Sequence, residues 1–249
     1  MKVRFAGIVG LITACFAGAA AAADLPARIY TKAPPPVAAY NWSGCYGGGN
    51  GGGVWSQNQW WQIGGTGQLF SSTNSDSWLA GIQAGCNYQF SGNWVVGIQA
   101  DYDWTDATSG GPHSTLLTLT DQSHLSGLGS VTGRVGYVFW DRWLGYVKGG
   151  GAWERVGYLQ YFPATGATFA TSGATLDGWT VGIGGEYGIT PNLSAFLEYD
   201  YYDFGTNTLT FATAGGGSPT INIHETQSVV KAGLNWRFNW LAGPVVAKY

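Results

Sequence analysis

Apolar and polar residues alternate along the chain from Trp78 to Trp104, with one break at Ser91-Gly92-Asn93. This period of two predicts two β-strands, residues 78–90 and 94–104, each with one apolar and one polar face. Strands of 13 and 11 residues are long for a soluble sheet, where about 5–6 is typical. They suit a bilayer span of roughly 9–11 tilted residues, and aromatic residues at both ends of a stripe are typical of interfacial girdles. The predicted lipid-facing positions are Trp78, Ala80, Ile82, Ala84, Cys86, Tyr88, Phe90, Trp94, Val96, Ile98, Ala100, Tyr102 and Trp104.

The same unit recurs through the chain. Short breaks at Ser91-Gly92-Asn93, Trp140-Asp141-Arg142 and Thr190-Pro191-Asn192 are spaced by 49 or 50 residues. Short turns on one side and long polar loops on the other are the asymmetry of outer-membrane barrels, with the turns periplasmic. We therefore predict an all-β fold, an eight-stranded antiparallel up-and-down transmembrane β-barrel over residues 42–238, with a further outward stripe of Trp179, Val181, Ile183, Tyr187 and Ile189. Its strands are expected at about 43–55, 78–90, 94–106, 124–139, 143–156, 175–189, 193–205 and 225–238, and its long loops at about 56–77, 107–123, 157–174 and 206–224.

The segments before and after the barrel have different patterns. Residues 1–23 combine a basic start, an apolar stretch and a small-residue site at Ala21-Ala22-Ala23, which predicts a secretory signal peptide. An alternative is lipidation at Cys15, which small residues also precede. Residues 24–41 contain three consecutive prolines and are predicted to be an extended periplasmic lead-in, and residues 239–249 a periplasmic C-terminal tail.

Composition agrees with a barrel. The chain is 10% charged and 15% aromatic and has 41 glycines, whereas a soluble domain carries about 25% charged residues. Removing Lys2 and Arg4 leaves 9 basic and 14 acidic residues, a net charge of −5, and no basic patch, so a nucleic-acid partner is not expected. The secreted context permits a disulfide between Cys45 and Cys86, which fall near the same end of the first hairpin. The favoured interpretation is that both cysteines are small apolar fillers on the outer face.

The last predicted strand carries a recognisable pattern. Lys231, Gly233, Trp236 and Phe238 resemble the assembly signal that the barrel-assembly machinery of Gram-negative bacteria reads in a last strand. Together with residues 24–28, 40–46 and 243–249, they make the mature chain similar to the small outer-membrane proteins of alphaproteobacteria, the RopB-like porin family. The resemblance implies a location in the bacterial cell outer membrane. Cys45 departs from the aromatic residue usual at that place in the family.

Charged residues share the inward parity of the predicted strands. About eight strands make an interior that side chains can fill, whereas water-filled porins need about 16–18. Charges in so narrow a space must pair, because an unpaired buried charge is unfavourable. The favoured hypothesis is a salt-bridged polar core that plugs the lumen, and the alternative is a selectivity filter along an open path. The predicted lumen charge network is Asp101, Arg134, Lys148, Glu186, Glu198, Asp200 and Lys231.

The residues give little support to catalysis. His224 and Ser228 share one face of the last strand, but four residues along a strand separate their Cα atoms by roughly 13 Å. His113 and His124 flank a segment with Asp121 and Ser123, a combination common without catalysis. We expect no cofactor or metal, and a structural or surface role in the cell envelope. The partners expected are outer-membrane lipids and lipopolysaccharide, with the barrel-assembly machinery during biogenesis. A narrow non-specific diffusion channel is the alternative, and a lipid-modifying enzyme is the least favoured.

Overall fold

A computed structural model describes residues 40–62, 69–112, 119–213, 215–216 and 220–238. All of them lie in one compact unit, Ala38–Tyr249. The expected signal peptide, the expected tail and all but the last two residues of the expected lead-in lie outside the described residues. Among the residues described, no helix is long and apolar enough to cross a membrane.

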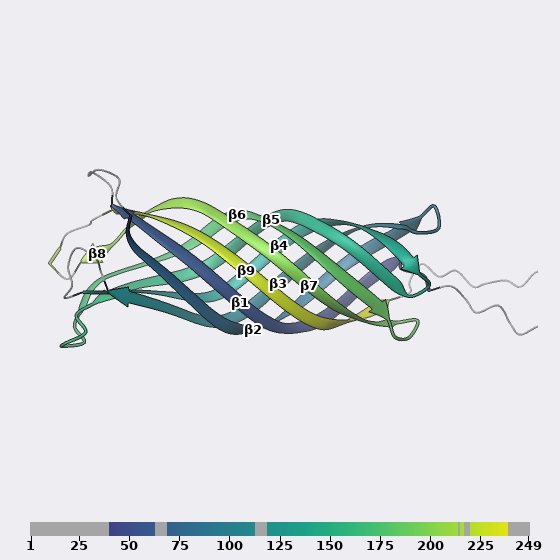
Figure 1. Cartoon of the computed structure of the whole chain (residues 1–249), viewed down its shortest axis with the longest axis horizontal. Helices are drawn as coiled ribbons and strands as arrows, with labels where there is room; N and C mark the ends of the chain where they lie inside the picture. Colours follow the sequence, from purple (N-terminus) through teal and green to yellow (C-terminus); the bar gives the residue numbers. More distant parts are fainter. Residues whose placement is uncertain (1–39, 63–68, 113–118, 214, 217–219, 239–249) are drawn as a thin grey trace, which may run out of the picture. The chain divides into compact units, whose positions relative to one another are not determined.

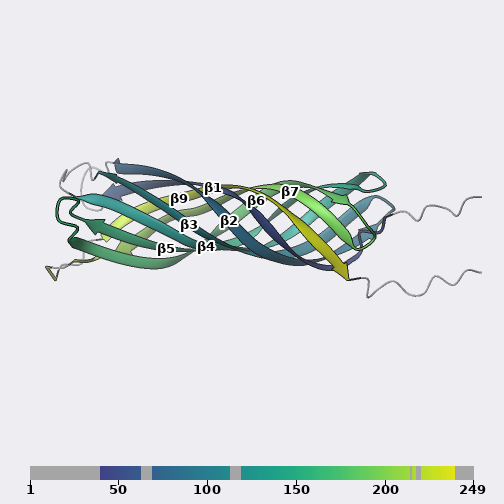
Figure 2. The ribbon, with the colours of Figure 1, turned by 90° about the horizontal axis from the view of Figure 1, so that it is seen from below.

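The described strands form an antiparallel sheet that closes into a ring (Figure 1). Each long strand pairs with the long strands before and after it, and the pairing of β1 with β9 closes the ring. Strand β8 is a two-residue addition to β6. The view in Figure 2 shows the same tilted strands from below. The predicted eight-stranded antiparallel barrel is therefore confirmed, with β1 (Gly44–Gln62), β2 (Leu69–Phe90), β3 (Trp94–Pro112), β4 (Thr120–Trp140), β5 (Trp143–Tyr161), β6 (Thr168–Gly188), β7 (Leu193–Thr210), β8 (Ala212–Thr213) and β9 (Thr220–Phe238).

The three predicted short turns join β2 to β3, β4 to β5 and β6 to β7 at one end of the barrel. The first is built on Ser91 and Gly92, whose φ angles are 47° and 78°. Two successive residues with positive φ match the twist of antiparallel strands in a tight hairpin. Gly92 adopts this conformation without steric conflict. These turns therefore fix the register within the β2–β3, β4–β5 and β6–β7 hairpins. The register determines which residues of these strands face outward and which face inward.

The lower part of the barrel wall has the predicted faces. Ile82, Ile98 and Ile183 are 57%, 66% and 60% exposed, while the residues between the stripe positions, such as Gln83 and Gln99, are buried in the interior. Aromatic residues border this apolar band at both ends, as expected for a barrel in lipid. We call the border farther from the tight turns the outer tryptophan girdle, formed by Trp55, Trp78, Trp104, Trp153 and Trp179.

The strands are longer than predicted. Segments 56–62, 69–77, 107–112 and 168–174, expected in loops, belong to strands β1, β2, β3 and β6. The prediction of long structureless connections is wrong, because the alternation of apolar and polar residues continues beyond the outer tryptophan girdle. There the polar residues point outward and many of the inward residues are apolar. Past Trp104, for example, Asp106 and Thr108 point outward and Ala107 points inward.

The barrel therefore has two storeys with opposite faces. Below the girdle the outer face is apolar and the interior polar, which suits lipid. Above it the outer face is mainly polar, which suits water, and the interior contains a large apolar cluster together with buried polar residues such as Asn58 and Asp121. The buried apolar cluster of the upper storey comprises Val54, Trp60, Leu79, Ala107, Leu125, Leu128, Ala152, Val156, Tyr158, Ala170, Leu176, Tyr202, Phe204, Leu209, Phe211, Ile221, Ile223 and Val229.

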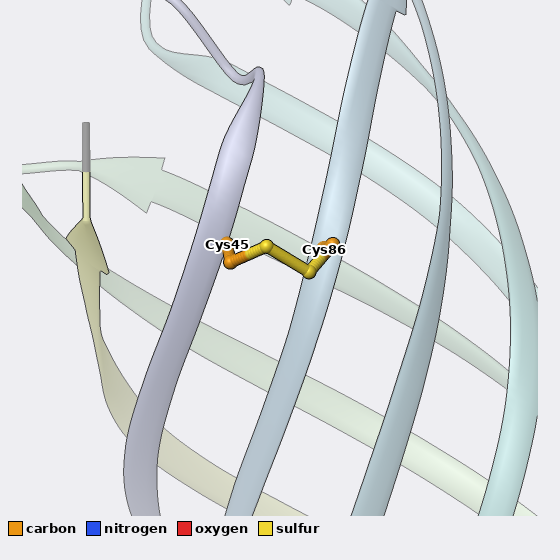
Figure 3. Close-up of a disulfide and its surroundings, with 2 residues drawn as sticks. All are labelled: Cys45 and Cys86. Carbon is orange, nitrogen blue, oxygen red and sulfur yellow. A yellow bond between two sulfur atoms is a disulfide. The ribbon is translucent and has the colours of Figure 1, made fainter. Parts of the chain in front are cut away.

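Cys45 and Cys86 form a disulfide between β1 and β2 (Figure 3). The favoured interpretation of two unpaired fillers is wrong, because the β1–β2 register places these residues directly opposite each other. Both remain on the outer face, as predicted. The bridge holds a strand with few other side chains, since β1 carries glycine at six of the seven positions from 47 to 53.

Some of these glycines are required by close packing. A Cβ on Gly48 would collide with the Leu234 carbonyl oxygen, and one on Gly52 would collide with the Val230 carbonyl oxygen. Both oxygens belong to β9, the strand that closes the ring on β1. The glycine-rich sequence of β1 thus permits tight approach at the seam of the barrel.

Introducing a cation into the apolar band tests the face assignment. Ile98→Arg and Ile183→Arg are each expected to lower the free energy of unfolding by about 2–4 kcal/mol, the range for a cation at the bilayer midplane. Asn74→Arg is the control, because Asn74 is exposed above the outer tryptophan girdle. Urea unfolding in lipid vesicles, followed by heat-modifiable gel mobility, measures the difference. Equal stability of all three variants would show that the faces are assigned wrongly.

Removing the disulfide tests its contribution to the seam. Cys45→Ser combined with Cys86→Ser is expected to lower the free energy of unfolding by about 2–4 kcal/mol, because the bridge shortens a long loop in the unfolded chain. Reducing agent should destabilise the wild type by a similar amount and leave the double variant unchanged. Identical urea midpoints for oxidised wild type and double variant would contradict this role.

Candidate functional site

The inward parity of the strands brings all seven predicted charged residues into the interior, where each is buried. They come from six different strands of the ring. Because the interior of an eight-stranded barrel is narrow, side chains from opposite walls meet at its centre. The seven are Asp101 on β3, Arg134 on β4, Lys148 on β5, Glu186 on β6, Glu198 and Asp200 on β7, and Lys231 on β9.

Two lysines form the middle of the network. Lys148 Nζ lies 2.6 Å from a Glu198 oxygen, 3.2 Å from Asp200 and 3.5 Å from Asp101. Lys231 Nζ lies 3.3 Å from Asp200, 3.4 Å from Asp101 and 3.6 Å from Glu198. Both ammonium groups therefore share the same carboxylates. This central network links β3, β5, β7 and β9 across the lumen.

A second group surrounds Glu186, nearer the tight turns. Arg134 NH2 lies 3.1 Å from Glu186 Oε2, and Arg237 NH2 lies 3.5 Å from Glu186 Oε1. The Ser194 hydroxyl and the Asn235 amide also donate to this carboxylate, at 2.5 Å and 3.2 Å. A carboxylate with this many donors is well compensated for its burial. The predicted single network is thus two groups, with Arg134 and Glu186 in the lower one.

Two charged members were missed from the sequence. Asp103 lies 3.2 Å from Lys231 Nζ, and Arg237 pairs with Glu186 as described. Parity could have identified both, since Asp103 follows Asp101 by two and Arg237 follows Lys231 by six. Within the described residues, the interior ion pairs join four cations to five carboxylates.

The chain entering β1 fills the interior at the turn end. Trp42 is fully buried and Tyr40 nearly so. The Arg237 guanidinium lies 4.8 Å from the Trp42 ring and 5.2 Å from the Tyr40 ring, and it donates to the Asn41 carbonyl at 3.1 Å. Cation–π contacts of this kind are stronger when desolvated. The side chains of Tyr40 and Trp42 therefore lie inside this end of the barrel, whereas Asn41 is exposed.

Tyrosines bracket Arg134 above this layer. Its guanidinium lies 5.0 Å from the Tyr46 ring and 4.7 Å from the Tyr146 ring. The Tyr46 hydroxyl donates to Gln99 at 2.7 Å, and the Tyr146 hydroxyl donates to Glu198 at 2.8 Å. The second contact joins the lower group to the central network.

The upper storey contains buried acids among its apolar residues. The Tyr158 hydroxyl donates to Glu225 at 2.6 Å, and the Gln227 amide donates to Glu154 at 3.0 Å. Glu154 and Glu225 are both about fully buried. The interior is thus occupied at three levels: residues 40–42 with the Glu186 group, the central network, and the upper apolar cluster with these acids.

The residues considered for catalysis are not brought together. Asp121 and Ser123 face the interior, whereas His124 points outward and pairs with Asp106. His224 approaches Thr206, and Ser228 approaches Tyr199. His113 lies outside the described residues. In the described part of the chain, no group of three metal-ligating side chains is close enough to hold an ion.

Comparison with known proteins agrees with the barrel. The family model described as "Outer membrane protein beta-barrel domain" matches residues 9–238. The chain is 28% identical to the 31 kDa outer-membrane immunogenic protein of Brucella melitensis over 245 residues, covering 93% of this chain and 98% of the relative. The Brucella suis protein of the same name matches equally. These matches confirm the resemblance to alphaproteobacterial outer-membrane barrels.

Among solved structures, the outer membrane protease OmpT of Escherichia coli is similar with a TM-score of 0.52. The match covers 80% of this chain and 98% of the protease, at 8% sequence identity. At this identity the likeness concerns the fold alone.

Neutralising one shared lysine tests the central network. Lys231→Met keeps a long side chain but removes the charge, and it is expected to lower the free energy of unfolding by about 3–5 kcal/mol, because it leaves buried carboxylates under-compensated. Adding Asp103→Asn should recover part of this loss, since the two residues pair directly. Urea unfolding of the single and double variants forms the cycle. Wild-type stability of Lys231→Met would contradict a structural role for the network.

Proposed function

Since this chain belongs to the outer membrane protein β-barrel domain family, we propose that it is an integral outer-membrane protein with a structural and surface role and a closed lumen. Its place in the bacterial outer membrane follows from the family and from relatives named outer-membrane proteins. The tight turns then lie in the periplasm and the upper storey outside the cell. The closed lumen is the specific part of the proposal.

The observation that supports a closed lumen is the occupation of the interior at three levels. Trp42 fills the periplasmic end, Lys148 and Lys231 bind carboxylates from several walls at the centre, and the apolar cluster fills the upper storey. A conducting path needs continuous room for hydrated ions. The interior of an eight-stranded barrel is just wide enough for side chains to fill it.

The alternative is a narrow diffusion channel. One observation favours it: a buried carboxylate oxygen of Glu154 makes no hydrogen bond within the described residues. Water at such atoms would satisfy them, and a connected file of such waters would be a path. The apolar cluster of the upper storey argues against connection, because it offers water few partners. Polar side chains buried with it bond to one another, as Asn58 does to Ser123 and Gln160 to Asp121.

The role outside the membrane is proposed from the four projecting hairpin ends. The Brucella relative is named an immunogenic protein, which supports exposure of the corresponding surface of this chain to antibodies and host surfaces. We assign no catalytic activity, since the likeness to a protease concerns only the fold. For biogenesis, Trp236 and Phe238 lie exposed on β9, the strand that closes the ring. This position supports their proposed role, with Lys231 and Gly233, as the assembly signal.

Conductance and melting measured together test the closed lumen. In planar bilayers the wild type should give no channel steps. Arg134→Ala should lower the melting temperature in detergent, with a loss of stability reaching about 3–5 kcal/mol, because Glu186 loses a buried partner. Arg142→Ala is the control, since Arg142 is exposed in a tight turn and should melt like the wild type. If the wild type conducts and Arg134→Ala has the same melting temperature as the wild type, the protein is a channel instead.

A further inference from the structure

Charged residues follow four of the five tryptophans of the outer tryptophan girdle at a constant offset. Two residues beyond Trp78, Trp104 and Trp179, on the same outward face, lie Asp76, Asp106 and Asp177. All three aspartates are exposed. Since the girdle marks the edge of the apolar band, these carboxylates lie at the height of the lipid headgroups. On β2, β3 and β6 the charge at this height therefore repels phosphate groups.

In the arc formed by β3, β4 and β5, a cation lies beside one of these aspartates. Arg155 occupies the same offset from Trp153, and it is the one Lys or Arg on the outer wall above the girdle within the described ranges. No described carboxylate forms a salt bridge with it. The nearby carboxylate of Asp106 is engaged by His124 Nε2 at 2.5 Å. Arg155 therefore has no salt bridge within the described residues, although Asp177 lies diagonally beside it on β6, opposite Trp153.

A groove lies on the outer wall at this arc. His124 on β4 pairs in register with Gly157 on β5, which pairs with Gly173 on β6. The two glycines leave the floor bare, and a Cβ on Gly157 would meet nothing within 4 Å. Two adjoining hollows of about 300 and 440 Å³ share His124 and Gly157. Their polar lining includes Thr108, Gln122, Ser126, Arg155, Ser172 and Thr175.

We propose that this groove binds the phosphorylated sugar headgroup of a glycolipid of the outer leaflet. A guanidinium binds phosphate with paired, charge-assisted hydrogen bonds, and the hydroxyl and amide groups of the lining suit the hydroxyls of a sugar ring. The bare glycine floor gives a bulky headgroup access to the wall. The groove lies immediately above the lipid-facing girdle, so its ligand arrives with its acyl chains already in the membrane. The inference rests on the orientation in the proposed function, and it is independent of whether the lumen is closed.

Two matched pairs of variants test the groove. Arg155→Gln removes the cation, and Arg142→Gln is its control at the periplasmic end. Gly157→Val fills the floor, and Gly133→Val is its control, since Gly133 also faces outward and has open space at its Cβ. The probes are bis-phosphorylated lipid A, dephosphorylated lipid A and inorganic phosphate. Binding to the full-length mature protein in detergent is measured by the rise in melting temperature and by native mass spectrometry.

Bis-phosphorylated lipid A should bind the wild type and both controls, and Arg155→Gln should weaken binding by at least about tenfold, the loss of one charge-assisted contact. Gly157→Val should weaken the binding of bis-phosphorylated lipid A by a similar factor. Dephosphorylated lipid A should bind the wild type as weakly as bis-phosphorylated lipid A binds Arg155→Gln. Equal binding to Arg155→Gln and Arg142→Gln would overturn the proposal, as would equal binding of both lipids or full competition by inorganic phosphate. If Gly157→Val does not fold, the arginine pair still decides. Channel steps from the wild type would refute the closed lumen alone.

Discussion

Closure of the sheet between β1 and β9 is the constraint on which the other features depend, because the bilayer core offers no hydrogen-bond partner to an open strand edge. At this seam β1 approaches β9 so closely that Gly48 and Gly52 leave no room for a Cβ. The same glycines weaken β1 as a strand, since glycine loses the most conformational freedom on folding. The Cys45–Cys86 disulfide joins this weak strand to β2. It therefore compensates, on the β2 side of β1, for the glycines that close packing against β9 requires.

Closure with eight strands also determines the interior. The wall is too narrow for a hydrated channel of the porin kind, so polar side chains that point inward must satisfy one another. The lysines at the centre do this by sharing carboxylates rather than by forming isolated pairs. In such a network each charge contributes mainly by compensating its neighbours, and loss of one member leaves the others buried without full compensation. A buried network of this kind is therefore weak support for a large gain in stability over an apolar interior.

The sequence predicted the fold and the membrane-spanning half of each strand because lipid outside and polar groups inside give an alternation of period two. It predicted the buried charges for the same reason, since parity alone places Arg134 and Lys148 inward. The upper storey was missed because polar residues at every second position, such as Asp106 and Thr108, were interpreted as loop rather than as the water-facing side of a strand. The disulfide depended on the register between β1 and β2, and none of the three short turns joins these strands, so no turn in the sequence indicated that Cys45 lies opposite Cys86. The division into two charged groups depended on the tilt of the strands, which no pattern along one strand contains.

At the outer tryptophan girdle the outer face of the strands changes from apolar to polar, and this change links the barrel wall to the proposed surface role. A barrel whose outer face stayed apolar along its full length would have no fixed depth in the membrane. Here Trp104 is followed on the same face by Asp106, and Trp179 is preceded by Asp177, so a shift of one or two residues toward the bilayer would bury carboxylates in lipid, which is strongly unfavourable. The apolar interior above the girdle allows the same strands to continue into water as a packed barrel. The change of the outer face from apolar to polar therefore sets both the depth of the barrel in the membrane and the length of strand that extends into water. The wall just above the girdle, where Arg155 replaces a carboxylate, is then fixed at the height of the lipid headgroups.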